Sequence, residues 1–409
     1  MTLGASFGCG STTDSLGGTK QPTVVLTPLK GPTKYPNVFR DIGKKTETEI
    51  DKKVEDAFQQ LFHGDPTDEA IYFPTGNYAD IYDVLHKEHR TEGYGLAMLI
   101  AVELNKREEF DNVWRGALRL RSMVPSSKAY FKSRCDVSST TANNMTSYVT
   151  EECLDPFGLE QFVMALIFAN DVWKEPRTID YAAAASDLLY LLRNVEDVNG
   201  GIVEGVTNTF DAKAKLVFHL PNVSAKNVTR PSLEIPAYYA LWAQATGDSF
   251  FSDAATAGRA YVNLAAHPMT GLTPVRASFD GDAIAPWDTF QAESYRVQLN
   301  LVLDALWTEN ADAVALSNRI LTFFTAQQVK LGMYGSEYSL DGMTVLNPMQ
   351  QGSLIAANGM SAVKATVADR KDYVDAMWEL PLSTGEPRYF SGLMELLSLL
   401  ALSGKLKVL

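Results

Sequence analysis

The sequence has few cysteines, more acidic than basic residues, and no long apolar run. Cys9, Cys135 and Cys153 are too few and too scattered to indicate a disulfide framework or a zinc site; a Cys135–Cys153 bridge and free buried thiols both stay open. With 36 Lys and Arg against 49 Asp and Glu, the formal net charge of −13 argues against nucleic acids and anionic membranes as partners. No segment approaches the ~20 apolar residues of a membrane span. We predict no metal and no cofactor.

The first 35 residues differ in composition from the rest. Residues 3–10 resemble the end of a bacterial lipoprotein signal in which Cys9 becomes the lipidated first residue, without the charged and apolar regions that precede such a cysteine. Residues 10–34 are rich in Gly, Ser, Thr, Lys and Pro, as in a flexible tether. We therefore expect residues 1–35 to be a trimmed, lipoprotein-like tether with Cys9 as a lipid anchor. The protein would be exported to a bacterial cell envelope, the periplasm or the extracellular space.

Residues 36–409 are expected to form a single helical domain. The chain is 46% apolar and 21% charged, enough for a substantial core, and from Thr46 onward apolar residues recur with a helical period. The pattern predicts twelve helices, at about 46–63, 92–105, 108–123, 157–172, 178–194, 233–246, 248–265, 288–308, 310–331, 350–365, 367–379 and 389–403.

The connections between these helices alternate between long and short. Short turns pair helices as antiparallel hairpins, and the even-numbered helices are the more apolar ones. Apolar helices belong inside and amphipathic helices outside, which predicts an all-α (α/α)6 barrel with six inner and six outer helices. A two-domain helical array is the alternative. In the barrel every long loop lies at one end, with small β-hairpins such as 201–204 paired with 215–219, and a cleft is expected there.

Glu92 is the candidate proton donor of this cleft. It begins a helix that is apolar on almost every face, so water should be scarce around its carboxyl group. An apolar environment disfavours a charged carboxylate and suits a general acid. The alternative is an acidic residue that only complements the helix dipole.

The other inner helices begin with residues that suit sugar binding. Carboxylates, aromatic rings and arginines around a groove can bind sugar hydroxyls and stack on sugar rings. The candidates for substrate binding are Asp155, Phe157, Leu233, Trp287, Arg296, Arg388 and Tyr389. Glu293 is the candidate for the second catalytic carboxylate, and Arg296, one helical turn later, should keep it ionised.

The segment Arg90-Thr91-Glu92-Gly93 resembles the general-acid region of family 8 glycoside hydrolases, in the branch that acts on xylan and includes reducing-end xylose-releasing oligoxylanases. Further matches lie at residues 61–66, 98–102, 108–114, 164–169, 235–242, 267–272, 295–297, 388–392 and 403–405. The resemblance implies an (α/α)6 barrel that hydrolyses β-1,4-linked glycans with inversion. It also implies that Glu92 is the general acid.

Several positions differ from the family's pattern around the sugar that is cleaved. Phe157 stands where the family has the first residue of Asp-Gly-Glu-Glu-Tyr, unless Asp155 reaches the same place. Residues 230–233 read Arg-Pro-Ser-Leu where the family has Asp-Pro-Ser-Tyr, and Glu293 stands where the base is an Asp. Because a longer side chain moves the carboxylate by roughly an ångström, the rate could fall about a hundredfold.

Two hypotheses follow for function. The first is an inverting glycoside hydrolase acting on a β-1,4-linked plant glycan, xylan or xylo-oligosaccharides, with Glu92 as acid and Glu293 as base. The second is a family 8-like protein that binds glycan with weak or no hydrolysis. Another (α/α)6 enzyme such as a lyase fits the order of the motifs less well. We expect a monomer whose partner is an oligo- or polysaccharide.

Overall fold

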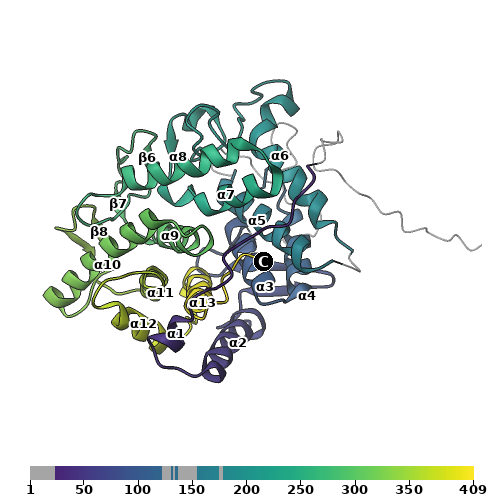
Figure 1. Ribbon diagram of the computed structural model, residues 1–409. Helices are drawn as coiled ribbons and strands as arrows, with labels where there is room; N and C mark the ends of the chain where they lie inside the picture. Colours follow the sequence, from purple (N-terminus) through teal and green to yellow (C-terminus); the bar gives the residue numbers. More distant parts are fainter. Residues whose placement is uncertain (1–23, 122–129, 132–133, 137–153, 175–177) are drawn as a thin grey trace, which may run out of the picture.

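The computed structural model describes residues 24–121, 130–131, 134–136, 154–174 and 178–409, and its helices form two concentric rings (Figure 1). The inner helices are α3 (Thr91–Glu103), α5 (Pro156–Val172), α7 (Pro236–Thr246), α9 (Arg296–Trp307), α11 (Gly352–Ser361) and α13 (Phe390–Leu402). The outer helices are α2 (Glu47–His63), α4 (Arg107–Leu118), α6 (Tyr181–Asn199), α8 (Ser249–Ala265), α10 (Ala311–Leu331) and α12 (Arg370–Glu379). A short helix, α1 (Val38–Asp41), precedes them.

The contacts between helices close the inner ring and attach the outer helices to it. Each inner helix packs against the next in the order α3, α5, α7, α9, α11, α13, and α13 packs back against α3. Each inner helix also packs against the outer helix that follows it in the chain, and α2 packs against α13. The predicted (α/α)6 barrel is therefore confirmed, and the alternative of two helical domains is wrong.

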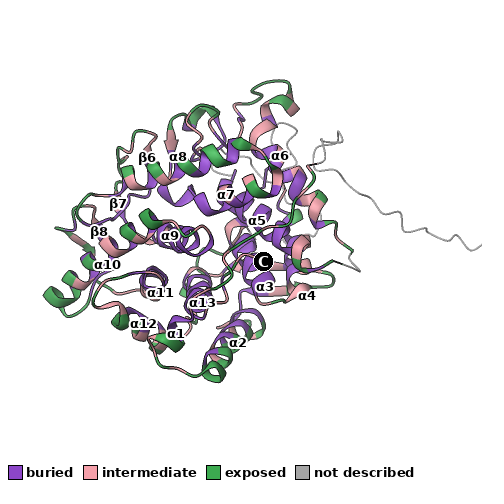
Figure 2. Ribbon diagram, viewed as in Figure 1, coloured by how far each residue is buried: buried purple, intermediate pink, exposed green. Residues whose placement is uncertain are grey.

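Burial separates the two rings as the apolar pattern predicted. Nearly every residue of α3 is buried, whereas α2 buries one face and exposes the other (Figure 2). Thr46 and Glu49 form the expected capping box at the start of α2. Inner helices also approach one another closely: a methyl group on Gly95 of α3 would lie 2.4 Å from the Cβ of Gln161 in α5. Only a glycine allows this contact.

The loops contain more sheet than the predicted hairpins. Four short antiparallel strands form one sheet in the order β1 (Tyr72–Thr75), β2 (Tyr78–Asp83), β3 (Glu88–Arg90), β4 (Arg134–Asp136). The pairing of β3 with β4 joins segments more than 40 residues apart, which local sequence does not reveal. The predicted hairpin of 201–204 with 215–219 is wrong, because Phe210 pairs with Val217 instead.

Two smaller sheets lie in the later loops. One pairs β5 (Val228–Thr229) with β6 (Ala277–Ser278), and the other has the order β7 (Thr289–Phe290), β8 (Glu337–Ser339), β9 (Val345–Asn347). Because β7 occupies residues expected to be helical, α9 begins at Arg296 and not near residue 288. A 3₁₀ turn, η5 (Ala292–Tyr295), joins β7 to α9 and carries Glu293.

Residues 24–35, predicted as part of a tether, lie against the barrel. The amide of Thr27 donates to the carbonyl of Ala245 at the end of α7, and the amide of Leu29 donates to Asp171 at the end of α5. Leu26, Leu29 and Tyr35 pack against the core. This segment therefore crosses the C-terminal ends of inner helices, opposite the end where Glu92 begins α3.

The membrane and disulfide predictions concern residues largely outside the described part of the chain. Cys9 and Cys153 both lie outside it, so lipidation and a Cys135–Cys153 bridge stay predictions. Within the described residues, no helix combines the length and the apolar composition that crossing a bilayer requires.

Candidate active site

Glu92 lies where the four-stranded sheet meets the inner ring. Strand β3 ends at Arg90 and α3 begins at Thr91, so Glu92 is the second residue of the helix. Its side chain is 14% exposed, and Nη2 of Arg296 donates to its carboxylate at 2.5 Å. Nη1 of Arg90 lies 3.8 Å from the other carboxylate oxygen. The apolar surroundings expected for Glu92 are therefore wrong, because two guanidinium groups from other elements flank it.

Glu293 lies across the ring, in the 3₁₀ turn before α9. Its carboxylate accepts a hydrogen bond from Nη1 of Arg230, and Nη1 of Arg296 lies 3.7 Å away. Burial alone would raise the pKa of Glu293, but Arg230 and Arg296 outweigh that effect and lower it below its ordinary value. Glu293 is therefore ionised at neutral pH, as the sequence predicted.

One guanidinium group joins the two carboxylates. Arg296 contacts Glu92 through Nη2 and Glu293 through Nη1. The two terminal nitrogens of a guanidinium lie about 2.3 Å apart, so the contacting oxygens are at most about 8.5 Å from each other. Inverting glycosidases hold their carboxyl groups ~6.5–9.5 Å apart, which leaves room for a water. The upper limit of about 8.5 Å admits this separation and also the ~5–5.5 Å of retaining glycosidases, so the choice of inversion rests on the family.

Two aromatic rings hold Arg296 in place. Its side chain is only 5% exposed, and its guanidinium carbon lies 4.7 Å from the ring centroid of Phe157 and 5.4 Å from that of Phe390. Phe157 comes from α5 and Phe390 from α13, so three inner helices fix one cation. A cation over an aromatic face is favourable, and more so where water is excluded.

Asp155 and Tyr389 lie next to Glu92 from two other inner helices. Asp155 caps α5 through the amides of Phe157 and Gly158, and it accepts a 2.7 Å hydrogen bond from the hydroxyl of Thr91. Burial, and then the charge of Glu92, raise its pKa. The Tyr389 hydroxyl is buried without a hydrogen-bond partner among the described residues. Burial and Glu92 together raise the pKa of Tyr389 far above its usual range.

The geometry agrees with what comparison with known proteins finds. The sequence model of Glycosyl hydrolases family 8 matches residues 82–404. The chain belongs to this family. It is 30% identical, over 91% of its length and 96% of the relative's, to the reducing-end xylose-releasing exo-oligoxylanase Rex8A of Paenibacillus barcinonensis. It is also 30% identical to a reducing end xylose-releasing exo-oligoxylanase of Halalkalibacterium halodurans, over 91% of this chain and 94% of that protein.

Solved structures of family 8 proteins superpose on the whole barrel. Rex8A of Paenibacillus barcinonensis complexed with xylose aligns with a TM-score of 0.82 and 30% identity, covering 93% of this chain and 99% of that chain. A family 8 xylobiose complex from Teredinibacter turnerae aligns with a TM-score of 0.78 and 29% identity, covering 92% and 98%. The likeness therefore extends over both helical rings.

Three further residues were predicted to bind substrate, namely Leu233, Trp287 and Arg388, and their surroundings differ. Leu233 is buried in the 3₁₀ turn η4 (Pro231–Leu233), which packs against η5. Trp287 is 38% exposed, and the guanidinium of Arg276 lies 4.7 Å from its ring centroid. The Arg388 guanidinium donates to the backbone carbonyls of residues 66, 70 and 385. Arg388 thus holds loops together, and its predicted contact with substrate gains no support.

The sequence analysis singled out Arg296 but gave no role to three other arginines near the two carboxylates, Arg90, Arg230 and Arg276. Arg90 lies 3.8 Å from the Glu92 carboxylate, and Arg230 and Arg276 lower the pKa of Glu293. The sequence analysis noted that Arg230 replaces the Asp of the family's Asp-Pro-Ser-Tyr motif, but it considered only the missing carboxylate. Reading it as the gain of a cation next to Glu293 would have required knowing that η4 packs against η5.

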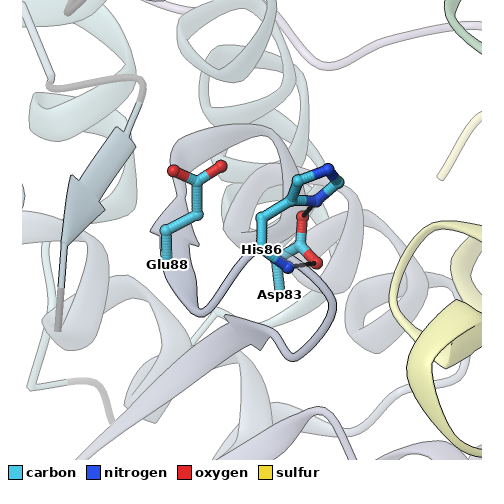
Figure 3. Close-up of side chains that lie close together, drawn as sticks. All are labelled: Asp83, His86 and Glu88. Atoms are coloured by element: carbon cyan, nitrogen blue, oxygen red, sulfur yellow. Dashed lines mark hydrogen bonds and ion pairs between the residues drawn. The ribbon is translucent and has the colours of Figure 1, made fainter.

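Asp83, His86 and Glu88 form a cluster of side chains (Figure 3). Their ligand atoms lie within 4.8 Å of one another, and Nδ1 of His86 is 2.7 Å from Asp83. Arg90 lies 3.1 Å from the Asp83 carboxylate and 2.5 Å from that of Glu88. The guanidinium thus supplies the positive charge that a metal ion would bring, and the cluster orients Arg90 towards Glu92. We assign no metal to it.

A cavity of about 350 Å³ lies between α2, α12 and α13, on a different part of the barrel. Its lining includes Lys53, Trp378 and Glu395 and neither Glu92, Glu293 nor any of the arginines near them. The candidate active site is therefore defined by the converging starts of the inner helices.

Proposed function

We propose that this protein is an inverting glycoside hydrolase of xylo-oligosaccharides, with Glu92 as general acid and Glu293 as general base. The observation that carries the proposal is the pair of carboxylates, Glu92 and Glu293, that contact the same guanidinium group of Arg296. Membership of family 8 supports hydrolysis of a glycosidic bond, and the relatives named as xylose-releasing exo-oligoxylanases support the substrate.

The proposed reaction divides the proton transfers between the two sides of the ring. The Glu92 carboxyl proton passes to the glycosidic oxygen as the bond between that oxygen and the anomeric carbon breaks. A water attacks the anomeric carbon from the opposite face, and its proton passes to Glu293. Arg296 fixes the positions of both carboxyl groups, which matters because misplacement by about 1 Å can cost a hundredfold in rate.

The contact with Arg230 makes Glu293 a weak general base in this proposal. A carboxylate has about four acceptor positions, so Glu293 can bind Arg230 and still accept a hydrogen bond from water. The same cation lowers the pKa of Glu293 and hence its proton affinity. We therefore propose slow hydrolysis. A protein that only binds glycan is the second candidate, and the Arg230–Glu293 contact is the observation that favours it.

The configuration of the product separates these candidates. Incubation with xylotetraose, followed by proton NMR at early times, is expected to show the α-anomer appearing first at the newly formed reducing end. Inversion of a β-linkage in a single displacement gives this anomer. Appearance of the β-anomer first would contradict inversion, and binding of xylotetraose without any product would identify the protein as a glycan-binding one.

The pH profile reports the state of Glu293. Its lowered pKa means that the base stays ionised below the ordinary carboxyl range, so the acidic limb of kcat/KM should lie below pH 4.5. Arg230→Gln removes a neighbouring cation, which raises the pKa of Glu293 and should move this limb to higher pH. Arg40→Gln, on the exposed surface, is the matched control. An unchanged acidic limb in Arg230→Gln would show that Glu293 is not the titrating base.

A further inference from the structure

Arginines are concentrated at the site although the chain as a whole is acidic. The formal net charge is −13, yet Arg230, Arg276 and Arg296 all lower the pKa of Glu293. Both terminal nitrogens of Arg296 are engaged, because its guanidinium lies between two carboxylates and two aromatic rings. Arg230 contacts Glu293 from the loop before α7, and Arg276 lies in the loop before α9.

Arg230 is held in a fixed orientation with donors to spare. Its Nε donates to Nδ1 of His219 at 2.6 Å, and its Nη1 donates to Glu293. Burial, followed by the charges of Arg230 and Arg276, lowers the pKa of His219 to about 2, so the imidazole is a neutral acceptor. Nη2 of Arg230 has no hydrogen-bond partner among the described residues, and the side chain is 21% exposed. Two N–H groups can therefore receive an anion.

Arg276 contacts the partly exposed aromatic ring of Trp287. Its guanidinium lies over the ring of Trp287, and its backbone amide donates to the Trp287 carbonyl at 3.1 Å. Trp287 is 38% exposed, so part of its ring can pack against a sugar. A sugar packed on Trp287 would lie beside the guanidinium of Arg276. Arg230 supplies a second guanidinium at Glu293, whose pKa both arginines lower.

We propose that Arg230 and Arg276, with Trp287, form a subsite for a sugar carboxylate, so that the preferred substrate carries a uronic acid. A planar guanidinium matches the two oxygens of a carboxylate better than any other side chain does, and such charge-assisted pairs are about twice as strong as neutral hydrogen bonds. Neutral xylose units offer only hydroxyl groups, which do not require two arginines. The inference rests on the proposed function and specifies its substrate: xylo-oligosaccharides with a glucuronic acid side group.

The test compares two ligands with the same backbone. Calorimetry on the full chain carrying Glu92→Gln, which prevents hydrolysis, measures binding of xylotetraose and of xylotetraose bearing one glucuronic acid. The acidic ligand is expected to bind about tenfold or more tightly at low salt, and the preference should shrink as salt screens the charges. Arg230→Gln and Arg276→Gln should each reduce the ratio of the two affinities to about twofold. Arg40→Gln is the control, and circular dichroism checks that each variant is folded.

Each other result overturns a different part of the argument. Equal affinity for the two ligands would overturn the uronate subsite and leave the proposed function intact. A preference that survives both arginine variants would place the carboxylate elsewhere and overturn the assignment to Arg230 and Arg276. Displacement of the acidic ligand by inorganic phosphate as readily as by free glucuronate would show a general anion site. Binding of neither ligand would overturn the proposed function itself.

Discussion

Replacing Glu92 with Gln is expected to lower kcat on xylo-oligosaccharides by about 10²- to 10⁴-fold, the usual contribution of a general acid. Gln keeps the size of the side chain and can still accept a hydrogen bond from Arg296, but it has no proton to give to the leaving oxygen. Binding of xylotetraose, measured by calorimetry, should change little, because the lost interaction operates in the transition state. Initial rates by product analysis give the kinetic part of the measurement.

The control for Glu92→Gln is a Glu-to-Gln substitution at an exposed ion pair. Glu55 pairs with Lys106 between α2 and α4, is 48% exposed, and lies outside the site. Glu55→Gln should leave kcat unchanged. Hydrolysis that survives in Glu92→Gln would show that the proton donor is another group, and Asp155 and Tyr389 are the neighbouring candidates. A fall in melting temperature for Glu92→Gln alone would indicate that its pairing with Arg296 matters for folding as well.

The architecture was predictable because its signals are local. Helical periods, the Thr46–Glu49 capping box and the alternation of long and short connections are all legible within windows of a few residues. Together they predicted the hairpins, the two rings and the end of the barrel where Glu92 lies. The strand pairings were less accessible, since β3 pairs with β4 across a connection of more than 40 residues. The start of α9 was misjudged for the same reason, because β7 pairs with β8 from a distant loop.

The environment of Glu92 could not be predicted from the local sequence. Its own helix is apolar, so the local sequence predicted an apolar pocket. The residue that determines its environment is Arg296, which lies 204 positions later in the chain. The sequence placed Arg296 near Glu293, one turn along the same segment, but gave no reason for it to reach Glu92 as well. The sequence therefore singled out Glu92, Glu293 and Arg296 one by one, but it did not predict that Arg296 contacts both carboxylates.

Arg296 should be the residue whose loss costs the most. It is buried against two rings and pairs with both carboxylates, so Arg296→Met would leave Glu92 and Glu293 with one fewer cation in a site with little water. Removing one partner of a buried ion pair costs about 3–5 kcal/mol of unfolding free energy. Activity should also be lost, because both catalytic groups lose the contact that positions them. Urea denaturation and initial rates on xylotetraose measure the two effects.

A variant at a second buried ion pair serves to distinguish an effect on stability from an effect on catalysis. Arg259 of α8 pairs in a bidentate manner with the buried Asp304 of α9, at 2.9 and 2.7 Å, away from the catalytic carboxylates. Arg259→Met should lower the unfolding free energy and leave kcat unchanged in the fraction that is folded. Arg296→Lys keeps the charge but offers a single ammonium group, which cannot bridge two carboxylates as a guanidinium does, so it should recover stability more than rate. Full activity in Arg296→Met would contradict the role of Arg296 as the group that sets the distance between Glu92 and Glu293.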